Sequence, residues 1–275
     1  MDLHMHSIFS DGEWTPEQLI RQANQSSVRT MAITDHDEIT GYVQGKNLAQ
    51  ELGIQLIAGI ELNTDGPDGE LHMLGYGFDP DSEQLVRHIS WRKQERREWA
   101  ERMINNLCKL GYDIDIEGCL THVTGDIIVR THIAEELKVK GYFRTANEAY
   151  ASLLVKGAKA YVDREPFSAK QAIELIHDIG GTAYIAHPGI YNTEVDFETL
   201  VRYGLDGIEV WHSKHSEDQV ISFWREAMRL KLEVSGGSDF HGPNSRNPYA
   251  IGSVSIPSSV KKEWEEKGLA LRGSE

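Results

Sequence analysis

Short apolar segments of this chain repeatedly end in histidine or in a carboxylate. The residues in question are His4 with His6, Asp35-His36-Asp37, Glu61, His187, and Asp239 with His241. Imidazole and carboxylate are the groups with which proteins bind Zn, Mn and Fe. If these segments are strands, several strand ends deliver such groups to one face. That arrangement suggests the mouth of a β/α barrel that holds more than one metal ion.

The size and composition of the chain fit one large α/β domain, or one such domain with an insert. The chain has 275 residues, of which 40% are apolar, so it can bury a substantial core. No apolar run approaches the ~20 residues of a membrane span, and no signal peptide is evident. The only cysteines are Cys108 and Cys119. We expect two free thiols in a reducing, cytoplasmic setting.

The charge of the chain restricts the ligands that it can bind. Its formal net charge is −15, from 28 basic and 43 acidic residues. A protein that binds long nucleic acid through its surface field is normally basic. We therefore expect no long duplex partner, and we expect any phosphate to be held locally by metal cations and a few arginines.

The order of the expected elements predicts a discontinuous α/β domain. In residues 1–80 we expect a first strand that ends at His4, helices at 15–25 and 39–52, and strands at 30–34, 55–60 and 70–78. In residues 160–275 we expect helices at 169–178, 197–203 and 216–230, and strands at 182–186, 207–211, 232–235 and 250–256. Strands that alternate with helices imply a parallel sheet, and seven or eight of them favour a closed barrel.

Residues 81–159 interrupt this alternation with a helical pattern. Trp99, Met103, Leu107 and Leu110 repeat at helical spacing, which predicts an amphipathic helix over 90–110. Two further helices are expected at 131–140 and 145–154. We interpret the segment as a helical insertion into the α/β domain.

Each candidate ligand also has a structural interpretation. His4 and His6 point to the same side of a strand, but a His-x-His pair also arises by chance; the longer pattern that adds Asp11 is more restrictive. The aspartates beside His36 also suit a helix N-cap. Glu61 follows four apolar residues, so it is either buried at a cost or coordinated, and we favour coordination.

The other histidines divide into two groups. His72, taken alone, is typical of a packed histidine. We expect His88, His122, His177 and His215 to be solvated, and the pattern leaves His132 and His212 ambiguous.

Six ordered motifs identify a resemblance that covers nearly the whole chain. They are DLHMHSIFSDG, AITDHD, GIE, LHMLGYG, AHP and SDFHG. In this order they closely resemble the polymerase and histidinol phosphatase (PHP) family, in particular its stand-alone bacterial branch. That branch includes nucleoside 3′,5′-bisphosphate phosphatases and the AM-type 5′→3′ exoribonucleases.

The resemblance implies a distorted (β/α)7 TIM-like barrel with two to three divalent metal ions, Mn, Zn or Fe. Carried over by motif, it assigns nine ligands. They would be His4, His6, Glu61 and Asp239 for one ion, Asp11, His36 and His241 for a second, and Glu61, His72 and His187 for a third. Glu61 would then bridge two ions.

A metal cluster of this kind suits hydrolysis of phosphate esters by a metal-bound hydroxide. We expect the insertion to form part of the substrate pocket. There Arg130 would bind phosphate and His132 would bind phosphate or protonate the leaving oxygen, an interpretation that we favour over a plain surface helix. Arg96 lies in a basic run that suits either substrate or a solvated helix face. At the end of an expected strand, Trp211 or His212 would stack on a base, although Trp211 suits the core equally well.

The leading hypothesis is a phosphoesterase acting on nucleotides. It would remove the 3′-phosphate of a nucleoside 3′,5′-bisphosphate, degrade short 5′-phosphorylated oligonucleotides, or do both. A histidinol-phosphate-type monoesterase is the alternative enzyme. A non-catalytic metal-binding or interaction module is the alternative of a different class. The sequence does not give the native metal or the oligomeric state.

Overall fold

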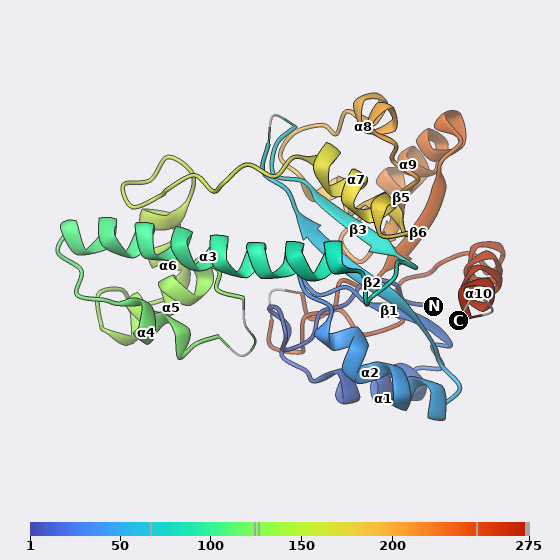
Figure 1. The fold of residues 1–275 in the computed structure, drawn as a ribbon, viewed down its shortest axis with the longest axis horizontal. Coiled ribbons are helices and arrows are strands. Elements are labelled where there is room, and N and C mark those ends of the chain that lie inside the picture. Colours follow the sequence, from blue (N-terminus) through green and yellow to red (C-terminus); the bar gives the residue numbers. More distant parts are fainter. Residues whose placement is uncertain (67, 124, 126, 246, 273–275) are drawn as a thin grey trace. The chain divides into compact units, whose positions relative to one another are not determined.

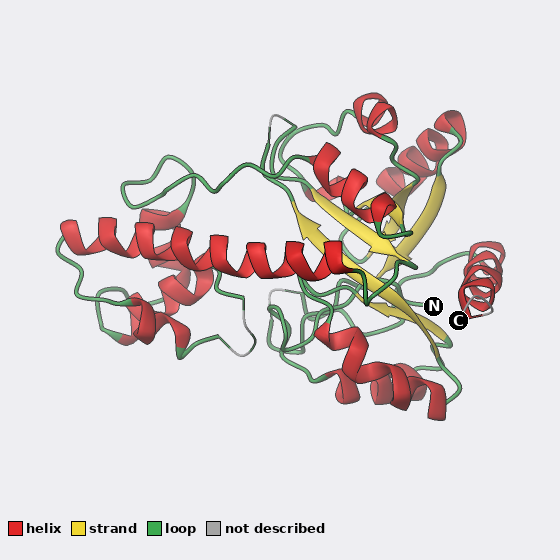
Figure 2. Ribbon diagram, viewed as in Figure 1, coloured by secondary structure: helices red, strands yellow, loops and turns green. Residues whose placement is uncertain are grey.

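The computed structural model describes residues 1–66, 68–123, 125, 127–245 and 247–272. Within this part the chain forms two compact units. One comprises Met1–Val86 with Pro166–Glu275, and the other comprises Arg87–Glu165. The first unit contains all the strands of the described chain, and the second is helical (Figure 2).

A six-stranded sheet organises the first unit (Figure 1). The strands follow chain order and are β1 (Thr30–Ile33), β2 (Gln55–Asn63), β3 (His72–Tyr76), β4 (Thr182–Ile185), β5 (Gly207–His212) and β6 (Glu233–Gly237). The pairs β1–β2, β4–β5 and β5–β6 are parallel. Strand β3 is antiparallel to both neighbours, so the prediction of a purely parallel sheet is wrong there. The described residues between β2 and β3 contain no helix, and a short connection without a crossover can only reverse the chain.

The N-terminal segment closes the curl of the sheet. The Asp2 amide donates to Thr30 on β1, and the Leu3 amide donates to Gly236 on β6. Asp2 also forms an isolated β-bridge to Met31, and Met5 forms one to Phe240. The segment therefore takes the place expected for a first strand, although it forms isolated bridges rather than a continuous ladder. Together these elements give the distorted barrel of the expected fold class.

The helices of the first unit pack on the outside of the sheet. They are α1 (Pro16–Gln25), α2 (Thr40–Glu51), α7 (Ala169–Asp178), α8 (Phe197–Tyr203), α9 (Glu217–Leu230) and α10 (Ser258–Arg272). Helix α1 begins with a capping box at Thr15, as its sequence predicts. Its apolar face joins a core formed with Met31 and Ile33 of β1 and with Phe240. Helix α10 was not expected, and the strand expected at 250–256 is wrong, because that segment is turn and loop.

The second unit has its own hydrophobic core. Its elements are most of α3 (Glu83–Lys109), α4 (Ile116–Leu120), α5 (Arg130–Val139), α6 (Ala146–Ala149) and a short π-helical turn, η1 (Tyr150–Leu154). Trp99, Met103 and Leu107 of α3 are buried together as predicted, whereas Leu110 is exposed. The Trp99 indole donates to the carbonyl of Val162, which ties α3 to the end of the unit.

None of the helices in the described part of the chain is long and apolar enough to cross a membrane.

Candidate metal centre

The structure brings the nine predicted metal-ligand residues together at one end of the strands in the first unit. Three groups each place their donor atoms within 4.8 Å of one another. The groups are His6, Asp11, His36 and His241; His4, His6, Glu61 and Asp239; and His36, Glu61 and His72. The ninth residue, His187, places Nε2 3.0 Å from Oε1 of Glu61.

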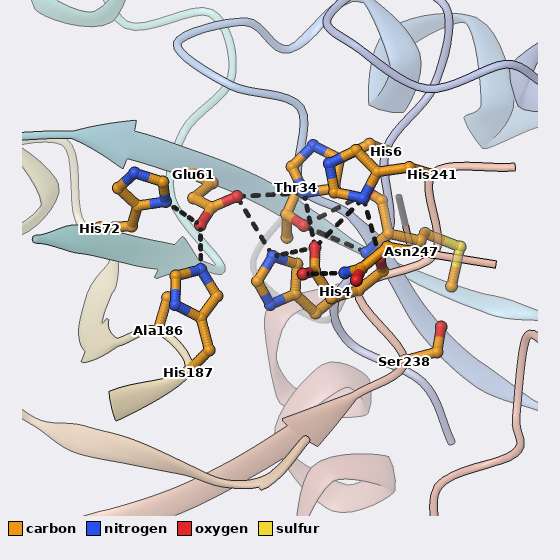
Figure 3. A network of polar contacts seen from close by, with 12 residues as sticks. His4, His6, Thr34, Glu61, His72, Ala186, His187, Ser238, His241 and Asn247 are labelled. Carbon is orange, nitrogen blue, oxygen red and sulfur yellow. Dashed lines mark hydrogen bonds and ion pairs between the residues drawn. The ribbon is translucent and has the colours of Figure 1, made fainter. Parts of the chain in front are cut away.

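Glu61 lies at the centre of this cluster, and its two oxygens face different histidines (Figure 3). Its Oε2 lies 3.2 Å from His4 Nε2, 3.0 Å from His6 Nε2 and 3.3 Å from His36 Nδ1. Its Oε1 lies 2.8 Å from His72 Nδ1. The side chain is 1% exposed, so this carboxylate has no solvent to compensate its charge. Its geometry suits a ligand shared between two cations.

Asp239 and Asp11 complete the acidic part of the cluster. Asp239 Oδ1 lies 3.3 Å from Nε2 of both His4 and His6. Asp11 Oδ1 lies 3.2 Å from His241 Nε2 and 3.9 Å from His36 Nε2. Each of the three carboxylates therefore lies beside two or more imidazole rings. Divalent transition metals commonly bind such mixed sets of carboxylate and imidazole groups.

In the absence of metal, the charges of the buried carboxylates affect the protonation of the neighbouring histidines. Burial disfavours the protonated form of His6, but the neighbouring carboxylates of Asp239 and Glu61, 3.3 and 3.0 Å from its Nε2, raise its pKa to about 10. Burial also opposes the charge of Glu61, yet His36, His4 and His72 hold its pKa well below its ordinary value. His36 differs, because burial lowers its pKa to about 3. Without metal, protons on some of these rings balance the carboxylates.

Several buried donor atoms of the cluster make no hydrogen bond within the described part of the chain. They are His6 Nε2, His36 Nδ1, Asp239 Oδ1 and His241 Nε2. Buried polar atoms are normally hydrogen-bonded, so such a group in one place calls for a partner that is not a protein residue. The residues present therefore fit divalent cations.

Local backbone structure delivers two of the ligands. His187 follows β4 with φ 29° and ψ 55°, and Asp239 follows β6 with φ 53°. A non-glycine residue in this region carries strain that the surrounding structure must hold. Gly12, beside Asp11, is also required: a Cβ there would lie 2.2 Å from the carbonyl oxygen of His6.

The sequence reasoning missed two buried residues that contact the ligands, Glu209 and Asn247, and it noted Asp35 only as a strand-end or helix N-cap aspartate. Glu209 accepts from His4, Asn247 donates to Asp239, and Asp35 binds the loop that carries Asp11. Asp35 accepts from the amide and hydroxyl of Ser7, both at 2.7 Å, and from the hydroxyl of Ser10 at 2.6 Å. Glu209 carries the signal that identified Glu61, a carboxylate inside an apolar strand, and could have been found by it.

The four candidate substrate residues lie in different parts of the chain. His212 is buried beside the cluster, with Nε2 3.2 Å from Asp239 Oδ2, and its neighbour Trp211 is buried against Trp224. Arg96, Arg130 and His132 belong to the helical unit. The guanidinium of Arg130 lies 5.3 Å from the ring of Tyr150.

His215 is not solvated, so that expectation is wrong. Its Nδ1 donates to the carbonyl of Val210, and its Nε2 accepts from the amide of Gly189. Burial lowers its pKa to about 4, so the ring is neutral near pH 7. The ring helps to hold the segment after His187.

Comparison with known proteins agrees with this geometry. Over 250 residues the chain is 33% identical to a 5′-3′ exoribonuclease of Haemophilus influenzae, covering 88% of this chain and 90% of the relative. It is 31% identical to a phosphoribosyl 1,2-cyclic phosphate 1,2-diphosphodiesterase of Eggerthella lenta (90% and 96% covered). It is 30% identical to a 3′,5′-nucleoside bisphosphate phosphatase of Chromobacterium violaceum (97% and 95% covered).

Solved structures and a family model extend this likeness. A crystal structure from Bifidobacterium adolescentis, described as a metal-dependent phosphoesterase, matches with a TM-score of 0.83 at 28% identity, covering 97% of this chain and 96% of that one. The model of the PHP domain matches residues 2–220. The family model and the relatives, together with the convergence of the strand ends on one buried carboxylate, show that this chain belongs to the PHP domain family.

Proposed function

We propose that this chain is a metal-dependent phosphoesterase that acts on small nucleotides. Its reaction would be removal of the 3′-phosphate from a nucleoside 3′,5′-bisphosphate, stepwise hydrolysis of short 5′-phosphorylated oligonucleotides, or both. The observation that carries the proposal is the convergence of nine imidazole and carboxylate side chains around Glu61. The relatives named for these two reactions support the choice of substrate.

The residues of the cluster would hold two to three divalent ions, Mn, Zn or Fe. Bound cations of this kind acidify water and stabilise the charge that develops on phosphoryl oxygens. The protein contributes the rest. Glu61 joins the donor groups into one cluster, and Asp11 and Asp239 supply the remaining negative charge. The cluster is buried, which strengthens each electrostatic contact within it.

Charge is distributed unevenly between the two units. Residues 87–165 contain 14 Lys and Arg against 12 Asp and Glu, whereas the rest of the chain contains 14 against 31. Apart from the metal cluster, whose cations would attract the phosphoryl group, the helical unit therefore repels a dianionic phosphate ester less than the acidic barrel does. This supports the proposal that the insertion supplies substrate-binding groups, with Arg130 and His132 as the main candidates and Arg96 as a further one.

A backbone contact of His132 decides which of its two ring nitrogens is the donor. Its Nδ1 accepts a hydrogen bond from the amide of Val129, so the proton of the neutral ring lies on Nε2. The Nε2–H of such a ring can donate a hydrogen bond to a phosphoryl or leaving oxygen. To transfer a proton, the ring would first have to be protonated at Nδ1, which would displace the amide of Val129. His212, by contrast, uses Nε2 towards Asp239 and accepts at Nδ1 from the amide of Lys214. For His212 we therefore propose support of Asp239 in addition to any contact with substrate.

A substrate panel tests the proposed reaction. The metal-free protein, reloaded with Mn²⁺, is assayed on a nucleoside 3′,5′-bisphosphate, short 5′-phosphorylated RNA, histidinol phosphate and a pentose 1,2-cyclic phosphate. We expect turnover of one or both nucleotide substrates, lost with chelator and restored with Mn²⁺. Preference for histidinol phosphate would replace the proposal by a monoesterase. Bound metal with no turnover would indicate a non-catalytic module.

The cyclic phosphate is included because one relative is named for hydrolysis of such a substrate. Turnover of the cyclic phosphate alone would make that reaction the function.

The role of Arg130 has its own test. Arg130→Ala should raise KM for a nucleotide substrate more than it lowers kcat, because a guanidinium that binds phosphate is lost. Arg144→Ala, an exposed arginine in the same unit, is the matched control. Wild-type kinetics for Arg130→Ala would remove this residue from the substrate site.

A further inference from the structure

Glu209 is a fully buried carboxylate that belongs to none of the three donor groups. It lies in the middle of β5, where its neighbours Ile208 and Val210 are completely buried apolar residues. A carboxylate in such a position is costly unless it is hydrogen-bonded and paired. Its contacts therefore indicate why it is there.

Both oxygens of Glu209 bind predicted metal ligands. Oε1 lies 2.9 Å from Nδ1 of His4, and Oε2 accepts from the backbone amide of His187 at 2.7 Å. An ionised carboxylate can only accept, so Nδ1 of His4 must carry a proton. The lone pair of the neutral His4 ring is then on Nε2, the atom that faces Glu61 and Asp239 at 3.2 and 3.3 Å.

The hydrogen bond from the His187 amide to Glu209 holds the backbone at a residue with a positive φ. The Nε2 of His187 lies 3.0 Å from Glu61 Oε1. Two residues on, the amide of Gly189 donates to His215 and its carbonyl accepts from Gln219. Glu209 thus fixes the start of a turn whose other end is also held.

An irregularity in β5 gives Glu209 this orientation. The register against β6 shifts between Glu209 and Trp211, as in a β-bulge. Residues three apart in a regular strand point to opposite faces. Here Glu209 contacts His4 while His212, three residues later, contacts Asp239. The bulge therefore turns two side chains of one strand towards the same cluster, a known use of such irregularities.

We propose that Glu209 is a positioning residue that prepares His4 and His187 to bind their cations. It would do so by holding His4 in the tautomer with a free Nε2 and by holding the turn at His187. Carboxylate partners of metal-bound histidines commonly affect metal affinity by 10- to 100-fold. The inference rests on the proposed metal cluster and is independent of the substrate.

Glu209→Gln tests this role because glutamine keeps the shape but cannot satisfy both contacts. If its carbonyl accepts from His4, its amide group faces the amide of His187, and the reverse placement opposes Nδ1–H of His4. We expect Zn²⁺ affinity to fall 10- to 100-fold for one or two ions, measured by competition with a chromogenic chelator. Glu233→Gln on β6 is the matched control, since Glu233 pairs with Tyr184 and Lys267 instead.

A spectroscopic readout separates positioning from general stability. In ¹⁵N-labelled, Zn²⁺-loaded wild-type protein, we expect His4 to show metal-bound Nε2 and a protonated Nδ1 whose downfield proton exchanges slowly with water. This resonance should be lost or shifted in Glu209→Gln and kept in Glu233→Gln. Wild-type affinity and an unchanged His4 spectrum in Glu209→Gln would overturn the proposal.

The wild-type spectrum decides the matter if Glu209→Gln does not fold. An unprotonated Nδ1, or a fast-exchanging one, on His4 of the loaded wild-type protein would also overturn the proposal. Neither measurement uses phosphoesterase activity, so a failure of the proposed reaction and a failure of this inference remain distinguishable.

Discussion

We expect Glu61→Gln to lower metal affinity by different amounts at the three donor groups, because they depend to different extents on this carboxylate. The group of His36, Glu61 and His72 would lose its only negative charge, and the group containing His4 would keep Asp239. The group containing His241 does not include Glu61 and would keep Asp11. Metal affinity should therefore fall most at His72, less at His4 and least at His241.

The size of the effect follows from the role of Glu61 as a ligand. Its Oε1 faces both His72 and His187, at 2.8 and 3.0 Å, so a cation held by these rings would lose its carboxylate. Replacement of a residue that only supports a metal ligand commonly costs 10- to 100-fold in metal affinity, so loss of the ligand itself should cost at least about 100-fold. At His241 the change should stay below about tenfold.

The assay is metal content and affinity, followed by activity. Wild type, Glu61→Gln and the control Glu51→Gln, an exposed glutamate at the end of α2, are dialysed against a series of free Zn²⁺ concentrations. Bound zinc is then measured by mass spectrometry. We expect Glu61→Gln to lose at least one ion per chain at concentrations that saturate the control, and to lose nucleotide hydrolysis. If Glu61→Gln keeps wild-type stoichiometry and affinity, the reasoning about the central carboxylate is refuted.

Three further results are expected. Metal affinity should fall as the pH is lowered from 9 to 6, by up to about tenfold per pH unit for each proton displaced. The reason is that His6, with a pKa of about 10, must release its proton before it binds a cation. Calorimetry in buffers of different ionisation enthalpy counts the protons released. Asp35→Asn should lower the free energy of unfolding by about 1–3 kcal/mol in urea denaturation, because a neutral amide would replace the buried carboxylate that accepts from Ser7 and Ser10, and an unchanged midpoint would contradict this. Gly41→Ala should cost about 1–3 kcal/mol in the same experiment, since its Cβ would lie 2.2 Å from Asp35 Oδ2, whereas Gly53→Ala, with open space around it but a positive φ, should cost less.

Local sequence patterns were sufficient for most helices and for most strands. The capping box at Thr15 and the apolar face of α3 are decided by residues within a few positions of each other. The same holds for the histidines and carboxylates that follow the strands, because a strand end and the residue after it are neighbours in sequence. Pattern reasoning failed at 250–256 and at α10, where packing rather than periodicity decides the conformation.

The sequence by itself determined which residue types are available at the strand ends, and motif resemblance suggested how they are grouped. Only the tertiary structure placed Glu61 of β2 against five histidines from four separate segments of the chain. The tertiary structure also directs Glu209 towards His4, which is 205 residues away in the sequence. The β-bulge that allows this contact is not predicted by the local sequence. The physical reason is that such contacts depend on strand pairing across the whole barrel, and pairing between distant strands leaves little trace in the residues near any one of them.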